Sequence, residues 1–164
     1  MSDKIKIAIA GFGNVASTLI KGLEFYKNST EGLWHPKLAG FDVTDVVVTG
    51  IFDIHPGIVG KKISDLVLDY KINSDLTIQP GISEDMISHN SALMGGKKST
   101  TYEELVSSLK KINPDFLINL ISSGMDKSGE KYAKASLEAG CSFLMPQLQK
   151  LQPSNYELRL HQKD

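Results

Sequence analysis

A glycine-rich turn near the start of the chain has the residue types and the spacing of a dinucleotide-binding site. Residues 11–16 read GFGNVA and lie between an apolar run at 5–10 and a helical pattern. In a GxGxxA turn the first glycine, here Gly11, permits a tight bend, and the second, Gly13, lets the backbone approach a pyrophosphate. Ala16 keeps the helix close to the strand. The helix N-terminus then offers unpaired amides and a positive dipole end to the diphosphate.

Asp53 supplies the second element of such a site, because it ends another apolar run at residues 46–52. An acid at that place accepts hydrogen bonds from the adenosine ribose and repels a 2′-phosphate. Asp53 follows Gly11 by 42 residues, whereas the simple motif has about 20. An inserted loop at 28–42 accounts for the excess. The one arginine is Arg159, far along the chain, so the pattern favours NAD over NADP; a solvated acid before a turn is the alternative interpretation of Asp53.

A hydroxyl-rich turn follows the apolar run FLINLI at residues 116–121. At the carboxyl edge of a strand it would meet the nicotinamide or its ribose, and ordinary turn chemistry explains it equally well. Asn73 is added on weaker grounds, and Ile54, next to Asp53, is also included. No catalytic residue is predicted in this chain. The residues predicted to bind the cofactor are Gly11, Gly13, Asn14, Val15, Ala16, Asp53, Ile54, Asn73, Ser122, Ser123 and Gly124.

Composition excludes several other classes of protein. The net charge of −1 on 164 residues gives no electrostatic attraction to nucleic acid or to an anionic membrane. The four histidines have no metal-ligand spacing, so no metal site is predicted and a surface or loop position is favoured for each. The single Cys141 fits a reducing, cytoplasmic compartment and is expected to be a packed thiol rather than a nucleophile.

The elements that must position these residues alternate between strands and helices. Strands are predicted at 5–10, 46–52, 116–121 and 142–145, with a short one at 76–78. Helices are predicted at 14–27, from Thr101 to the stop at Pro114, and at 128–139. The second helix begins at a capping box of Thr101 and Glu104, and the third ends at Gly140 as a left-handed cap. This alternation predicts an α/β fold, a Rossmann-like doubly wound parallel sheet with helices on both faces. Residues 1–145 form the predicted NAD-binding domain, and 146–164 a divergent or truncated tail.

Beyond the general fold, the chain resembles bacterial and archaeal myo-inositol-1-phosphate synthases in the NAD-binding, N-terminal part of that family. The resemblance rests on KIAIAGFGNVASTLIKGLEFYK, on GLWHPKLAGFDVTDVVVTGIFDIHPGIVGKKISDLV and on INPDFLINLISSGMDKSGEKYAKASLEAGCSF. It includes the GxGNxAS turn, the FD pair that ends the second strand and part of a G-K-x-x-S-D pattern. The long insertion before Asp53 is its most specific element, and the similarity extends over residues 4–144.

The resemblance implies an enzyme of inositol and phospholipid biosynthesis that converts glucose 6-phosphate to inositol phosphate. Bound NAD oxidises the sugar at C5, enolisation and ring closure follow, and NADH returns the hydride. The family's catalytic lysines lie in a region that follows residue 145 and that this chain lacks. We therefore expect the cofactor half of such an isomerase, inactive alone or completed by a separate chain or a homo-oligomer. A stand-alone NAD-binding or regulatory module and a small NAD-dependent dehydrogenase with its substrate site at 69–98 are the alternatives.

Overall fold

The computed structural model describes residues 4–68, 70–72, 74–85 and 99–146. Within these residues the main sheet contains β1 (Ile5–Ala10), β4 (Val46–Asp53), β5 (Gln79–Pro80), β6 (Phe116–Asn119) and β7 (Ser142–Leu144). The helices are α1 (Asn14–Phe25), α2 (Ile63–Leu66), α3 (Tyr102–Ile112) and α4 (Asp126–Ala139). A hairpin of β2 (Lys37–Leu38) and β3 (Phe41–Asp42) and a 3-10 turn, η1 (Val43–Asp45), precede β4. Asn73 and the predicted tail from residue 147 onward lie outside the described residues.

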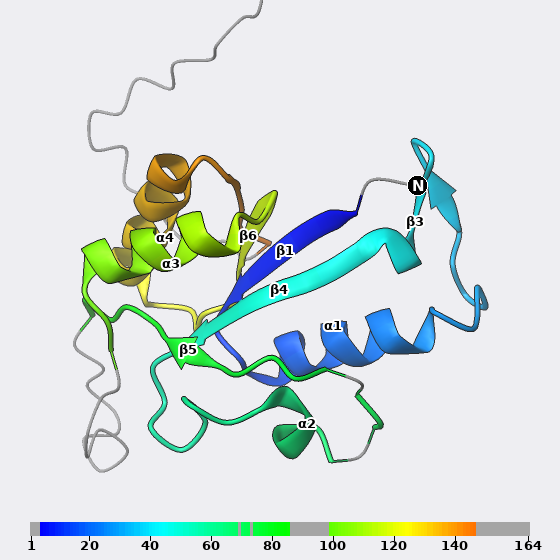
Figure 1. The fold of residues 1–164 in the computed structure, drawn as a ribbon, viewed down its shortest axis with the longest axis horizontal. Helices are drawn as coiled ribbons and strands as arrows, with labels where there is room; N and C mark the ends of the chain where they lie inside the picture. The colour runs from blue at the N-terminus through cyan, green and yellow to red at the C-terminus, as the bar shows by residue number, and fades with distance from the viewer. Residues whose placement is uncertain (1–3, 69, 73, 86–98, 147–164) are drawn as a thin grey trace, which may run out of the picture.

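The order of the strands makes the sheet doubly wound. They pair as β5-β4-β1-β6-β7, and every pairing is parallel. The chain therefore moves outward from β1 through β4 to β5, then returns to add β6 on the other side of β1 (Figure 1). Ligands of such sheets bind outside the carboxyl ends of the strands, where the order reverses. The predicted Rossmann-like α/β fold is confirmed.

Alternation along β1 divides the core into two layers. Ala8 and Ala10 belong to the cluster packed by α3 and α4, together with Leu105, whereas Ile9 belongs to the cluster packed by α1 and α2, together with Ala16. Successive side chains of a strand point to opposite faces. A strand covered on both faces must therefore be apolar where it is buried, as β1 is from Ile7 to Ala10. The two helix pairs lie on opposite sides of the sheet (Figure 1).

The predicted ends of two helices are confirmed. The Thr101 hydroxyl accepts a hydrogen bond from the Glu104 amide at 3.2 Å, and the Glu104 carboxylate accepts one from the Thr101 amide at 3.0 Å. This reciprocal pair satisfies two amides that have no partner within α3. Gly140 ends α4 with a φ of 80°, the left-handed conformation that a glycine adopts without steric cost.

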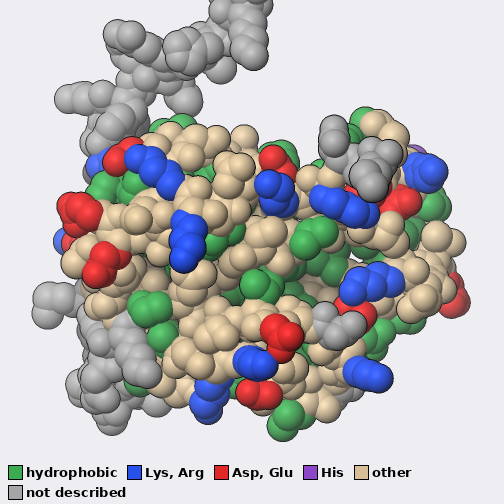
Figure 2. All heavy atoms as spheres, viewed as in Figure 1, with side chains coloured by type: hydrophobic (Ala, Val, Ile, Leu, Met, Phe, Trp, Pro, Cys, Tyr) green, Lys and Arg blue, Asp and Glu red, His purple; other side chains and the backbone are tan. Residues whose placement is uncertain are grey.

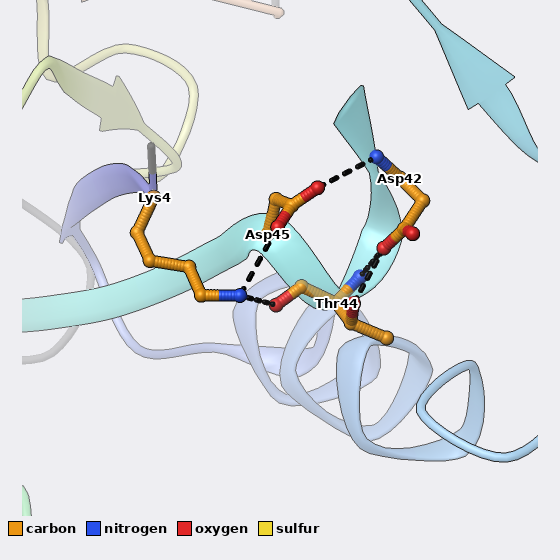
Figure 3. Close-up of polar contacts among 4 residues, drawn as sticks. All are labelled: Lys4, Asp42, Thr44 and Asp45. Carbon is orange, nitrogen blue, oxygen red and sulfur yellow. Dashed lines mark hydrogen bonds and ion pairs between the residues drawn. The ribbon is translucent and has the colours of Figure 1, made fainter. Parts of the chain in front are cut away.

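The segment inserted between α1 and β4 is more ordered than the loop predicted for it, because it contains the β2–β3 hairpin. An ion pair between a half-exposed lysine and a buried aspartate holds the end of this segment against the sheet. Lys4 Nζ lies 3.0 Å from Asp45 Oδ1, and Asp45 Oδ2 accepts the Asp42 amide at 3.1 Å (Figure 3). Lys4 Nζ also donates a hydrogen bond to the carbonyl oxygen of Thr44 at 3.2 Å. These contacts lie at the amino-terminal ends of β1 and β4. The insertion therefore lengthens the sequence before Asp53 without displacing it from the carboxyl edge.

The edge strand β5 differs from its prediction. The predicted strand at 76–78 is instead an irregular segment paired with the turn before α2, where the amide of Ile78 bonds the carbonyl of Lys61 at 3.0 Å. The strand proper is Gln79–Pro80, which pairs with the last two residues of β4. A two-residue strand that contains a proline has no apolar period, so the pattern could not reveal it.

The surface mixes charges of both signs, and Figure 2 shows lysine and acidic side chains interspersed over the face in view. Among the described residues, no helix has the length and apolarity required to cross a membrane. The same residues contain no group of three or more His, Cys, Asp or Glu side chains arranged to hold a metal ion. Cys141 is buried, and burial raises the pKa of its thiol, as expected for a packed cysteine.

Candidate functional site

The glycine turn begins at a position that only glycine can occupy. Gly11 follows β1 with a φ of 89°, and its amide donates to the carbonyl of Phe52 at 2.7 Å. A Cβ at this position would lie 2.8 Å from backbone atoms of Leu120 and Ile121. The turn after β1 therefore passes directly against the turn after β6. Both the conformation and this close approach require a residue without a side chain.

Gly13 has a different role in the same turn. It is the N-cap of α1 in an extended conformation, with a φ of −101° that any residue can adopt. A Cβ there would meet nothing within 4 Å. Gly13 has no side chain with which to cap the first amides of α1, and the first turn of the helix contains no acid. Gly13, Asn14 and Val15 are exposed, whereas Ala16 is fully buried beneath them. Open space therefore faces the positive end of the helix.

Asp53 joins the end of β4 to this turn. One carboxylate oxygen, Oδ2, accepts the amide of Phe12 at 2.7 Å, and the other, Oδ1, accepts the amide of His55 at 2.7 Å. A carboxylate offers about four lone-pair sites, so capacity remains for further donors such as a pair of ribose hydroxyls. The side chain is only partly buried. Asp53 is thus oriented by the backbone on both sides and still faces solvent.

These elements surround a cavity of about 520 Å³ at the carboxyl edge of the sheet. This size lies within the range of about 300–1,000 Å³ that is usual for small-molecule sites. One wall is formed by the segment that follows β4, and the opposite wall by the turn after β6 and by α4. The lining residues are Gly11, Phe12, Gly13, Asp53, Ile54, His55, Pro56, Ile58, Ile82, Leu120, Ile121, Ser122, Met125 and Tyr132.

A buried tyrosine fixes the far wall of the cavity. The Tyr132 hydroxyl accepts the amide of Ile82 at 3.0 Å, and a Cβ on Gly81 would overlap this hydroxyl. Gly81 in turn donates its amide to the carbonyl of Asp53 at 2.7 Å. Burial, reinforced by the nearby Asp53 charge, raises the pKa of Tyr132 well above its usual range. The hydroxyl stays protonated and ties α4 to the segment beside Asp53.

Replacing Tyr132 by phenylalanine is expected to lower the free energy of unfolding by about 1–3 kcal/mol, because the Ile82 amide would remain buried without a partner. The matched control is Tyr102→Phe, which removes a hydrogen bond of 3.1 Å to Glu138 from a more exposed site. That change is expected to cost about 0.5 kcal/mol or less. Urea unfolding of both variants measures the difference, and equal losses would contradict the structural role of Tyr132.

The N-terminus of α4 is already occupied by an acidic side chain from a distant segment. The Asp85 carboxylate accepts the amides of Lys127 and Ser128 at 3.1 and 2.8 Å and the Ser128 hydroxyl at 2.6 Å. The Ser128 hydroxyl also accepts the amide of Glu84 at 2.9 Å. A negative side chain thus takes the place that an anion would occupy at this helix. Of the two long helices that start near the cavity, α1 is the one whose N-terminus faces open space.

The structure brings most of the predicted site residues together. Five of them line the cavity, namely Gly11, Gly13, Asp53, Ile54 and Ser122. Asn14 and Val15 form the adjoining first turn of α1, Ala16 packs below it, and Ser123 and Gly124 continue the exposed turn after β6. Asn73 lies outside the described residues.

The sequence interpretation missed the apolar walls of the cavity. Ile82, Met125 and Tyr132 lie far apart in the chain and carry no motif. The residues just after the strands, such as Ile121, could have been suspected, because strand ends meet at one edge of a parallel sheet. His55 is exposed, as expected, yet it lies on the rim of the cavity, where its Nδ1 accepts the amide of Gly57 at 3.0 Å.

Comparisons with known proteins confirm the resemblance inferred from the sequence. No protein-family model matches the chain. It is 28% identical to the inositol-3-phosphate synthase of Mycolicibacterium smegmatis over 157 residues, which cover 87% of this chain and 43% of that enzyme. The chain thus spans less than half the length of this curated relative.

Solved structures agree with this similarity. The crystal structure of Ari2 matches 89% of this chain and 46% of its own, with a TM-score of 0.71 and 25% identity. A myo-inositol-1-phosphate synthase-related protein from Thermotoga maritima matches 85% of this chain and 47% of its own. Its TM-score is 0.67 and its identity 20%, a likeness of fold.

Proposed function

We propose that this chain binds NAD in the cavity between the glycine turn, Asp53 and α4. The observation that carries the proposal is the 2.7 Å hydrogen bond from the Phe12 amide to the Asp53 carboxylate. It makes the expected diphosphate site and the expected ribose site parts of one cavity, despite their unusual separation in sequence. The open space at Gly13 and the uncapped start of α1 fit a diphosphate.

Each part of the cofactor then has its own set of residues. The amides of Gly13, Asn14 and Val15 would hold the diphosphate, and Asp53 would accept the hydroxyls of the adenosine ribose. Ile54 would lie beside the adenosine, and Ser122, Ser123 and Gly124 would lie on the nicotinamide side. A 2′-phosphate would meet the Asp53 charge, so NAD is preferred over NADP.

At the level of the enzyme, we propose that residues 1–145 are the cofactor domain of an inositol-3-phosphate synthase-like isomerase. The resemblance to that family supports this assignment. Bound NAD would accept a hydride from C5 of glucose 6-phosphate and return it after ring closure. This chain's own residues would hold and orient the cofactor, whereas the sugar-phosphate site and the catalytic lysines of such an enzyme would be supplied by residues other than these.

A calorimetric titration of the folded chain with NAD and, separately, with NADP tests the cofactor assignment. The expected result is one site for NAD with an affinity at least about tenfold higher than that for NADP, the equivalent of about 1.4 kcal/mol. Circular dichroism on the same sample establishes that the chain is folded. Failure of a folded chain to bind NAD would refute the proposed function.

Changing Gly13 to serine is expected to separate binding from folding. The extended N-cap conformation suits serine, whose hydroxyl would cap the amides of α1 and raise the free energy of unfolding by about 0.3 kcal/mol. The added side chain and its hydroxyl would compete with the diphosphate for the same space and amides. NAD affinity should fall by about tenfold or more. Thermal melting and calorimetry of one preparation measure both effects, and unchanged NAD affinity would remove Gly13 from the site.

A further inference from the structure

One ionisable side chain on the rim of the cavity is not used by the proposed function. His55 lies two residues after Asp53, and its amide donates to Asp53 Oδ1 at 2.7 Å. Its carbonyl oxygen accepts the amides of Ile58 and Val59, each at 3.1 Å. The backbone of His55 is therefore fixed on both sides, whereas its side chain is exposed at the edge of the cavity that it helps to line.

The imidazole ring of His55 is held in one orientation and in its neutral form. Its Nδ1 accepts the amide of Gly57 at 3.0 Å, so this nitrogen carries no proton and the proton of the ring is on Nε2. The ring packs closely on Gly57, where a Cβ would lie 2.9 Å from the Cε1 atom of His55. Gly57 is exposed, so its amide can bond water when a proton is added to Nδ1.

Protonation of His55 would change the charge at the place where the adenosine ribose is expected. Of the described residues that line the cavity, those that titrate are Asp53, His55 and Tyr132. The glycine turn, Ile82 after β5 and the turn after β6 place no titratable side chain among these residues. Burial raises the pKa of Tyr132 well above its usual range, so its hydroxyl stays neutral. Histidine changes its charge between about pH 5 and 8, and within that range His55 sets the charge beside the Asp53 carboxylate.

A 2′-phosphate on the adenosine ribose is the ligand group most sensitive to this charge. An acid at the end of the second strand of such a sheet repels the phosphate, whereas a cationic side chain nearby accommodates it. An imidazolium at His55 would supply such a cation two residues from Asp53. It would also attract the carboxylate and compete with the ribose hydroxyls of NAD for its lone pairs. Both effects reduce the preference for NAD over NADP.

We infer that His55 makes the cofactor specificity of this site depend on pH. The preference for NAD over NADP is strong while the imidazole is neutral, and it narrows when the imidazole is protonated. The inference rests on the proposed function and adds a specificity-determining residue to it. An exposed pair of opposite charges changes an equilibrium by up to about fivefold. The ratio of the NAD and NADP affinities should therefore narrow by at least about threefold when the pH is lowered from about 8 to about 5.5.

Calorimetric titration of the full chain with NAD and with NADP at about pH 8 and at about pH 5.5 tests the inference. Circular dichroism at both pH values establishes that the chain is folded. The expected result is a preference for NAD of at least about tenfold at the higher pH, narrowed by at least about threefold at the lower pH. An unchanged ratio would overturn the inference while leaving NAD binding intact. Absence of NAD binding by the folded chain at both pH values would instead refute the proposed function.

The variant His55→Gln separates the imidazole from the other groups that titrate. Glutamine is neutral at both pH values, so the narrowing should be at least about threefold smaller than in the parent protein. The 2′-phosphate itself takes up a proton near about pH 6, and the comparison with the parent removes this effect because it is common to both proteins. His35→Gln makes the same change at an exposed histidine that does not line the cavity, and it should narrow as the parent does. Equal narrowing in the parent and in His55→Gln would overturn the inference.

The variant His55→Lys makes the opposite change. Lysine keeps its positive charge at both pH values, so the preference for NAD should already be narrowed by at least about threefold at the higher pH. Lowering the pH should then change the ratio less than it does in the parent protein. A ratio at the higher pH equal to that of the parent would show that a charge at this position does not act on the 2′-phosphate, and would overturn the inference.

Discussion

Replacing Asp53 by arginine is expected to weaken NAD binding by about 1–3 kcal/mol, roughly a 5- to 150-fold loss of affinity. The carboxylate accepts the amides of Phe12 and His55, each at 2.7 Å, and keeps lone pairs for a ribose. A guanidinium group has no acceptor, so the substitution removes the ribose contact, the bond from Phe12 that orients the glycine turn, and the bond from His55 in the segment after β4. The positive charge would also favour a 2′-phosphate, and the preference for NAD over NADP should shrink or reverse.

Two further variants separate the contributions to this loss. Asp53→Asn keeps one acceptor oxygen and removes the charge, so its NAD affinity should lie between those of the parent protein and of Asp53→Arg. Glu31→Arg makes the same charge change at an exposed residue outside the cavity, and its affinity should match that of the parent. Calorimetry with NAD and NADP measures all three variants. Unchanged affinity in Asp53→Arg would exclude Asp53 from the site.

The substitution Gly11→Ala is expected to have the largest effect on stability, a loss of about 3 kcal/mol in the free energy of unfolding. A Cβ would approach backbone atoms of Leu120 and Ile121 to 2.8 Å, and such overpacking costs about 1–3 kcal/mol. The φ of 89° adds about 1–2 kcal/mol for any residue other than glycine. Because the clash is with backbone, neither turn can yield without moving the end of β1 or β6.

Gly140→Ala is the matched control for this prediction. Gly140 also has a positive φ, of 80°, but a Cβ there would meet nothing within 4 Å. The control should therefore cost only about 1–2 kcal/mol for the backbone conformation. Urea unfolding compares the two variants, and the excess loss in Gly11→Ala measures the contact between the two turns. Equal losses would show that the turns can separate at no cost.

The sequence predicted features that depend on residues close together in the chain. The apolar run of β1, the helical period that follows it and the glycine turn between them are all local, and the structure has each at its predicted place. The same holds for the cap of Thr101 and Glu104 and for the end of α4 at Gly140. Such features follow from steric and hydrogen-bonding preferences that act over a few residues.

Other features could not be predicted from the sequence, because they depend on contacts with residues far away in the chain. Leu120 and Ile121 continue the apolar run of β6, yet the strand ends at Asn119. The Leu120 amide makes a last bond to the carbonyl of Ala10 at 2.7 Å, and the backbone of both residues then turns past Gly11. The segment before β4 contains a hairpin rather than a loop, closed by the ion pair of Lys4 with Asp45. Neither contact leaves a period or a motif in the sequence.

By itself, then, the sequence determined the alternation of strands and helices, the position of the glycine turn and the acid at the end of β4. Each of these features depends only on residues that are close together in the chain. Only the tertiary structure decided that the Phe12 amide bonds Asp53, that Tyr132 supports the opposite wall through Ile82, and that Asp85 occupies the start of α4. These contacts join residues some 40 to 50 positions apart. They form only once the parallel sheet brings the carboxyl ends of its strands to one edge, because the order of the strands, not their sequence, determines which ends are neighbours.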